Sequence, residues 1–108
     1  MISRLWSARC ALEHAEAYER LLLTEILPEL DKVDGCLGAY VMRRQAGEEI
    51  EFAVLHLFES LAAIRAFAGA EYEMAVVPAE ARALLASFDP VAQHFDVRAT
   101  PVNRALGA

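Results

Sequence analysis

The sequence predicts one α+β domain of the split β-α-β-β-α-β type, with a four-stranded antiparallel sheet and helices on one of its faces. Three observations predict this fold class. Residues 2–10 alternate between two faces, as the side chains of a strand do. Residues 13–33 place apolar side chains three or four positions apart, as an amphipathic helix does. Residues 36–58 contain two further strand-like runs joined by a short turn, which is typical of a hairpin.

The first helix contains a proline. Pro28 lacks a backbone N–H, so we expect a kink near Leu27 or a second short helical segment that starts there. The dipeptide Asp34-Gly35 is typical of a helix stop. The apolar stripe of this helix consists of Ala15, Tyr18, Leu22, Ile26, Leu30 and Val33.

The predicted hairpin is followed by a short helix. Its strands cover residues 36–44 and 50–58, and Gly47 in the turn between them is free to adopt a positive φ. Ser60 has the side chain of an N-cap, and Gly69 is typical of a residue just past a helix end.

The last third of the chain predicts another helical stretch and a fourth strand. Pro78 marks either a break in that stretch or the start of a helix. The turn at Asp89-Pro90 leads into a strand over residues 91–98, which completes a domain over residues 1–99. Residues 100–108 are expected to form a C-terminal tail that is loose or reaches a partner. The buried side of the helical stretch is marked by Met74, Val77, Ala81, Leu84, Leu85 and Phe88.

The sequence has more apolar residues than one domain can bury, which predicts that a second copy of the chain is its partner. The third strand is apolar on both faces, with Val54 on one and Leu55 on the other, but helices cover only one face. The hydrophobic fraction of 56% exceeds the ~45–50% that is usual. We therefore expect a homodimer that packs sheet against sheet.

The cysteines predict no covalent or metal-binding role. This ferredoxin-like pattern usually has the strand order 4-1-3-2, so Cys10 and Cys36 lie on strands that are not neighbours and should not form a disulfide. The sequence contains no Gly-rich phosphate loop, Ser-His-Asp spacing or Cys/His cluster. We expect neither a metal nor a cofactor.

The charge balance excludes two classes of partner. The formal net charge is −6, whereas nucleic acids and anionic membrane surfaces attract clustered Lys and Arg. No apolar run reaches the ~18 residues that a membrane span needs. The N-terminus also lacks the basic start and long apolar core of a signal peptide. We expect a cytoplasmic protein.

Four segments resemble the antibiotic biosynthesis monooxygenase superfamily, the dimeric α/β barrels. They are RLW in the first strand, DGCLGAYVMRR in the second, EFAVLHLFES leading into LAAIRAFAG, and DPVAQHFDV in the fourth. The resemblance covers about residues 1–99. It implies a pocket between sheet and helices that binds a small aromatic or polycyclic phenol. The protein is then either a cofactor-independent monooxygenase that deprotonates this phenol for reaction with O₂, or a non-catalytic barrel that binds a small hydrophobic ligand.

The heme-degrading branch of the superfamily carries three markers that this sequence lacks. They are an Asn in the first strand, a Trp in the helix after the third strand, and a His shortly afterwards that ligates iron. Phe67 stands where that Trp would be, Val76 or Val77 stands where that His would be, and the first strand has no Asn. The resemblance therefore disfavours heme degradation.

Two histidines are candidate catalytic bases. His56 shares its strand face with apolar residues such as Val54, and desolvation would lower its pKa and keep it a base at neutral pH. It is alternatively a core or dimer-interface histidine. His94, on the fourth strand, is the preferred candidate because its more polar surroundings admit water or substrate. It is alternatively a half-exposed strand histidine or a dimer contact.

Four further residues are candidates for binding the substrate. Arg4 and Trp6 share a face of the first strand, where Arg4 can neutralise a phenolate or a carboxylate beside an aromatic wall. Phe67 stands where the heme-degrading branch has its Trp. Tyr72 lies between the two later helices, where a lid would lie. Each is alternatively an ordinary packing residue.

Overall fold

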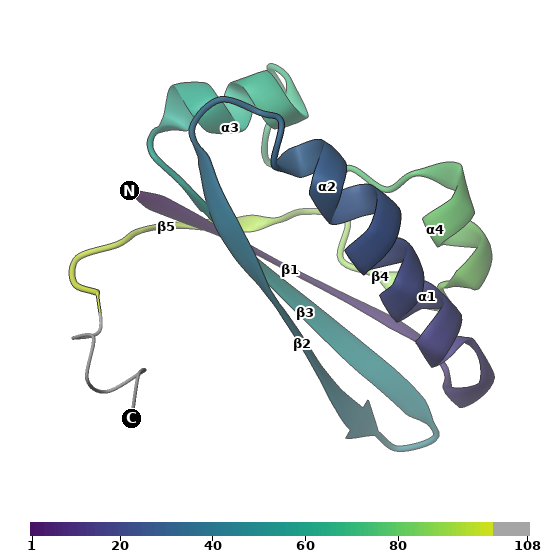
Figure 1. The fold of residues 1–108 in the computed structure, drawn as a ribbon. Coiled ribbons are helices and arrows are strands. Elements are labelled where there is room, and N and C mark those ends of the chain that lie inside the picture. The colour runs from purple at the N-terminus through teal and green to yellow at the C-terminus, as the bar shows by residue number, and fades with distance from the viewer. Residues whose placement is uncertain (101–108) are drawn as a thin grey trace.

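The computed structural model describes residues 1–100, in which one antiparallel sheet carries all the helices on one face (Figure 1). This confirms the predicted fold class. The strands are β1 (Ile2–Ala11), β2 (Cys36–Ala46), β3 (Glu49–Phe58), β4 (Ser87–Phe88) and β5 (Gln93–Asp96). The helices are a 3-10 turn (Leu12–His14), α1 (Ala15–Leu21), a π-helical turn (Leu22–Ile26), α2 (Leu27–Leu30), α3 (Leu61–Ala68) and α4 (Ala79–Leu84). The predicted tail falls largely on residues 101–108, which lie outside the described residues.

The strand order is β2-β3-β1-β4, with β5 also paired to β1. This is the predicted order with its fourth strand in two pieces. The β1–β3 ladder runs without interruption from Ile2 opposite Phe58 to Ala11 opposite Glu49. Cys10 and Cys36 are both free, and β3 separates their strands.

The fourth strand differs from the prediction of one strand over residues 91–98. Pro90 has no N–H to donate to the ladder, so the chain leaves β1 between β4 and β5. It bonds instead to the loop before α4. Ala75 N–H donates to the Pro90 carbonyl at 2.9 Å, and Ala92 N–H donates to the Glu73 carbonyl at 2.8 Å. β5 is therefore two residues shorter than the predicted strand at each end, and β4 is a further short strand that the sequence did not predict.

The last helical stretch is shorter than predicted. α4 begins directly after Pro78, which is extended and disfavours helix in the residue before it. Met74 therefore lies in a loop and is 50% exposed, and Phe88 lies in β4. Their placement on the buried side of a helix was wrong.

The predicted interruption at Pro28 is confirmed. The turn Leu22–Ile26 is π-helical, with Leu27 N–H donating to the Leu22 carbonyl, and α2 starts at Leu27. The wider turn lets the helix continue past a residue that cannot donate (Figure 1). The two predicted ends of α3 are also confirmed, because Ser60 Oγ accepts from Ala63 N–H at 3.2 Å and Gly69 has φ +86°.

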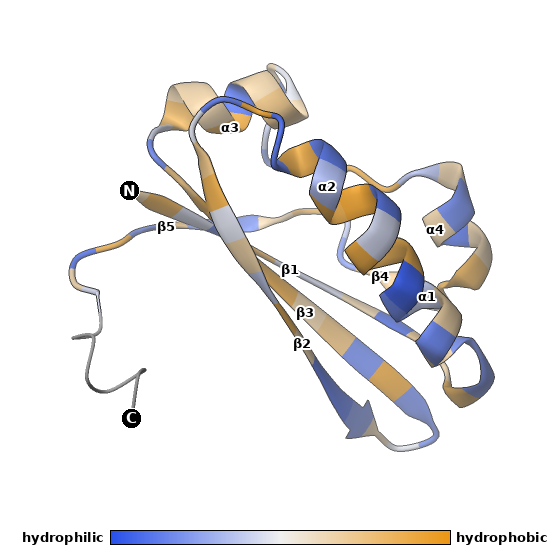
Figure 2. Ribbon diagram, viewed as in Figure 1, coloured by the Kyte–Doolittle hydropathy of each residue, from blue (hydrophilic) through white to orange (hydrophobic). Residues whose placement is uncertain are grey.

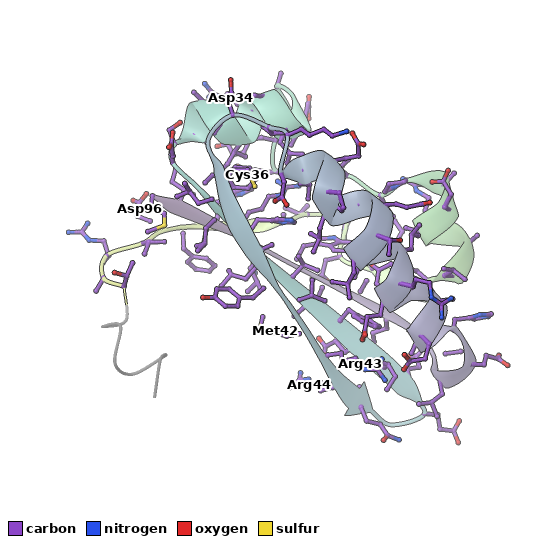
Figure 3. All side chains as sticks on the ribbon, in the orientation of Figure 1. Asp34, Cys36, Met42, Arg43, Arg44 and Asp96 are labelled. Carbon is purple, nitrogen blue, oxygen red and sulfur yellow. The ribbon has the colours of Figure 1, made fainter. Side chains whose placement is uncertain are left out.

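The two faces of the sheet have different surroundings. Alternate residues of β3 are buried under the helices. Figure 2 shows that these helices carry both hydrophobic and hydrophilic residues. Figure 3 shows Arg43 of β2 on the helix side, where it pairs with Glu16 and Glu19 of α1, and Met42 on the opposite side. That opposite side, the open face, has no helix over it. Its large apolar side chains include Leu5, Tyr40, Met42, Leu55, Leu57 and Phe95.

Candidate functional site

A cavity of about 50 Å³, the inner cavity, lies between the sheet and the helices. β1 and β3 form its floor, and the helical stretch from α1 to α2 forms its roof. The lining is apolar apart from four side chains. These are Arg4, Trp6, Tyr18 and His56.

A larger hollow of about 330 Å³, the outer groove, adjoins the inner cavity. An inner volume of about 50 Å³ has room for about three or four water-sized groups, so an aromatic ring system must extend into the outer groove. The residues that line both are Ile26, Leu30, Phe67, Val76 and Pro78.

Arg4 is the charged group of the inner cavity. It is only 3% exposed, and burial lowers its pKa. Nη1 donates to the Tyr72 carbonyl and lies 3.1 Å from His94 Nε2, and Nη2 donates to the Met74 carbonyl at 3.1 Å. The guanidinium carbon also lies 5.3 Å from the centre of the Phe67 ring. Within residues 1–100, Arg4 forms no ion pair with a carboxylate.

His56 lies directly opposite Arg4 in the β1–β3 ladder and also lines the inner cavity. The residue is 9% exposed, and its buried Nε2 has no hydrogen-bond partner among the described residues. The rings of Phe58 and Phe67 have their centres 6.0 and 6.2 Å from its own. Burial, and then the charge of Arg4, lower the pKa of His56 to about 4, against a smaller opposing effect of Asp31. The imidazole is therefore neutral at neutral pH.

His94 does not line the inner cavity and reaches it only through Arg4. It lies opposite Arg4 on β5, half-buried, with its ring edge-on to that of Tyr72 at 5.2 Å between centres. Burial, and then Arg4, lower its pKa, which leaves Nε2 free to accept from Arg4. His94 therefore lies against Arg4 and not in the cavity wall, which makes His56 the better candidate for contact with a ligand.

The other predicted binding residues divide in the same way. Trp6 and Phe67 line the inner cavity, and Trp6 is fixed because its Nε1–H donates to the Asp89 carbonyl at 2.6 Å. Tyr72 contributes only its carbonyl, which holds Arg4. Its ring lies outside the cavity, with the Arg65 guanidinium carbon 5.6 Å from its centre.

Sequence reasoning missed Tyr18 as a site residue. It is 1% exposed, packs edge-on against Phe52 and lines the inner cavity from above. Burial raises the pKa of its hydroxyl, so the phenol stays protonated. The available signal was that Tyr18 is the only side chain with a polar group in the apolar stripe of its helix.

The described residues contain no cluster of three or more His, Cys, Asp or Glu side chains that would hold a metal ion. Val76 and Val77, one of which the resemblance places where the heme-ligating His would be, are apolar parts of the cavity wall. The residues present do not fit a heme iron there. In the same part of the chain no helix is long and apolar enough to cross a membrane.

The family model for antibiotic biosynthesis monooxygenase matches residues 1–77. The chain belongs to this family. The inner cavity lies between the layers of a family domain, and Arg4, His56 and Phe67 all fall within the matched residues. A comparison with curated proteins gives no match.

Three solved structures share the fold of this chain. A Deinococcus radiodurans protein, provisionally described as an antibiotic biosynthesis monooxygenase, has TM-score 0.66 and 18% identity over 95% of this chain and 97% of its own. The heme-degrader MhuD of Mycobacterium tuberculosis, solved with two hemes in its active site, has TM-score 0.60 and 18% identity over 94% and 100%. A Chloroflexus aurantiacus protein described like the first has TM-score 0.58 and 13% identity over 94% and 96%. At these identities the likeness shows a shared fold.

Proposed function

We propose that the protein is a cofactor-independent monooxygenase that acts on a small aromatic or polycyclic phenol. The phenolic oxygen lies in the inner cavity between Arg4 and His56, and the ring system lies in the outer groove. His56 accepts the phenolic proton, and Arg4 stabilises the phenolate. The observation that carries this proposal is the pairing of an unpartnered, buried His56 Nε2 with an Arg4 that has no carboxylate partner among residues 1–100.

The low pKa of His56 makes the proton transfer depend on Arg4. A base with a pKa of about 4 is a weak acceptor for a phenol, whose pKa is ordinarily about 10. The Arg4 guanidinium lowers the energy of the phenolate, because a charge-assisted hydrogen bond is strong where water is excluded. The negative charge of the phenolate in turn offsets the repulsion between Arg4 and the His56 imidazolium that forms.

The oxygen chemistry needs O₂ as the co-reactant. The phenolate gives one electron to O₂, and the resulting radical and superoxide combine to form a carbon–oxygen bond. A proton completes the hydroperoxide. Loss of water then leaves a carbonyl at the oxidised carbon, so one oxygen atom enters the product and the other leaves as water.

The second candidate is a non-catalytic barrel that binds a small hydrophobic ligand. The weak basicity of His56 favours this reading, since a neutral imidazole can hold a hydroxyl group without taking its proton. The apolar outer groove serves either function.

We further propose that the open face is the dimer interface. Tyr40, Met42 and Phe95 on this face are 54%, 45% and 53% exposed in the single chain. Exposed apolar side chains gathered on one sheet face are typical of a protein contact. A second copy packed sheet against sheet would cover them. The cytoplasmic location stays a prediction from the sequence.

The test of the enzyme is O₂ uptake with anthrone, whose enol form is a phenol and whose oxidation yields a quinone and water. We expect uptake by the wild type and a loss of about 100-fold in His56→Gln, the usual effect of removing a general base. His14→Gln is the matched control, because His14 is exposed and lies away from the cavity. Full activity of His56→Gln would contradict the assigned role, and binding without uptake would favour the second candidate.

A further inference from the structure

The charge of Arg4 is the feature of the inner cavity that a plain phenol leaves unexplained. Among residues 1–100, the ion pairs join Lys32 to Glu29, Arg43 to Glu16 and Glu19, and Arg44 to Glu51. Arg4 is more deeply buried than any of these cations, yet its polar contacts are two carbonyls and a neutral imidazole. A buried cation is costly without an anion close to it. A ligand anion would supply that charge.

Arg4 retains the means to bind such an anion. A guanidinium has five N–H donors, and three hydrogen bonds to described residues leave two without a partner there. Two N–H groups are what a carboxylate accepts in a bidentate pair. The contacts with the Tyr72 and Met74 carbonyls fix the guanidinium before any ligand binds.

His56 offers a second polar contact next to the first. It faces Arg4 across the ladder on the same face of the sheet, and such pairs have Cβ atoms about 5 Å apart. Its Nε2 is buried, unpartnered and in the cavity lining. Two neighbouring groups on one ligand edge can therefore contact Arg4 and His56 together.

The outer groove indicates that only one end of the ligand is anionic. Its wall is apolar, but it also includes three exposed acidic side chains, of Glu25, Glu29 and Glu80. These carboxylates disfavour a second negative charge at the far end of the ligand, whereas the inner end meets a cation.

We propose that the ligand is a phenolic acid: an aromatic compound whose carboxylate pairs with Arg4 and whose neighbouring hydroxyl contacts His56 Nε2. The inference rests on the proposed function and narrows its substrate class. The small inner cavity holds the two polar groups, and the apolar ring system lies in the outer groove.

The test compares four ligands with the intact protein by calorimetry at pH 7. They are 2-naphthol, 2-naphthoate, 3-hydroxy-2-naphthoate with adjacent groups, and 6-hydroxy-2-naphthoate with the same groups on different rings. We expect 3-hydroxy-2-naphthoate to bind about 10- to 100-fold more tightly than 2-naphthol, as one charge-assisted pair allows. It should also bind about tenfold more tightly than the 6-hydroxy isomer, which cannot contact both residues.

Variants assign the preference to Arg4. In Arg4→Gln the preference for 3-hydroxy-2-naphthoate over 2-naphthol should fall to within about threefold, and Arg4→Lys should keep part of it. Arg65→Gln is the matched control, because Arg65 contacts the Tyr72 ring outside the cavity. If Arg4→Gln does not fold, the comparison of ligands on the wild type still decides.

The outcomes separate the two proposals. Binding of 2-naphthol as tight as that of 3-hydroxy-2-naphthoate would overturn the phenolic acid and leave the proposed function in place. Equal binding of the two hydroxynaphthoates would also overturn it, because adjacency would not matter. Failure of all four ligands to bind would overturn both proposals.

Discussion

His56 should make the protein less stable as the pH falls. Its pKa in the folded protein is about 4, below the ordinary 6.5 expected in the unfolded chain. Between these values the unfolded chain binds a proton that the folded protein does not, so stability is present at neutral pH and lost on acidification. The loss attributable to His56 is about 2 kcal/mol by pH 5 and about 3 kcal/mol by pH 4.

The assay is urea denaturation of the wild type, His56→Gln and the control His14→Gln between pH 7 and pH 5, at one protein concentration. Other groups also titrate, so the informative quantity is the difference between the wild type and each variant. The free energy of unfolding of the wild type should fall by about 2 kcal/mol more than that of His56→Gln. His14→Gln should follow the wild type. Parallel curves for the wild type and His56→Gln would refute the buried, uncharged state of His56.

Three further predictions concern the fold and the dimer. Gly35 has φ +87°, and a Cβ there would lie 2.6 Å from the Cβ of Ala63. In urea denaturation Gly35→Ala should therefore cost about 2 kcal/mol or more, against about 1 kcal/mol for Gly47→Ala in open space, and equal costs would contradict this. Leu55→Glu on the open face should give a folded monomer in sedimentation experiments, whereas a stable dimer would argue against that interface. Ser60→Ala removes the N-cap of α3 and should cost about 1 kcal/mol in thermal unfolding, and an unchanged Tm would speak against the cap.

The parts of the fold that local signals specify were predicted well from the sequence. The alternation in β1, the turn at Gly47 and the cap at Ser60 each depend on residues close in sequence. The segment from Met74 to Ala92 was predicted poorly. Its conformation depends on hydrogen bonds between residues far apart in sequence, such as Ala75 with Pro90. It also depends on two prolines, Pro78 before α4 and Pro90 between β4 and β5. Their effect on the helix and on the pairing with β1 is clear only once the residues packed against them are known.

The sequence predicted which residues form the site better than it predicted how they are arranged. Strand alternation placed Arg4 and Trp6 on one face and His56 on the face of Val54, and the register then brings Arg4 opposite His56. The choice of His94 over His56 followed the polarity of neighbours along the strand. That signal could not show that Arg4 lies between His94 and the cavity. Tyr18 was missed because a helical stripe has the same pattern whether it covers a solid core or a cavity.

The measurement that tests the central claim most directly is a ¹⁵N NMR titration of the histidine side chains with 2-naphthol at pH 7. The claim is that the inner cavity is a ligand site in which His56 contacts the phenolic oxygen. The His56 signals should be those of a neutral imidazole and should move to saturation as the phenol is added, while those of His14 stay in place. Binding detected by calorimetry without any movement of the His56 signals would contradict the claim, and so would an absence of binding.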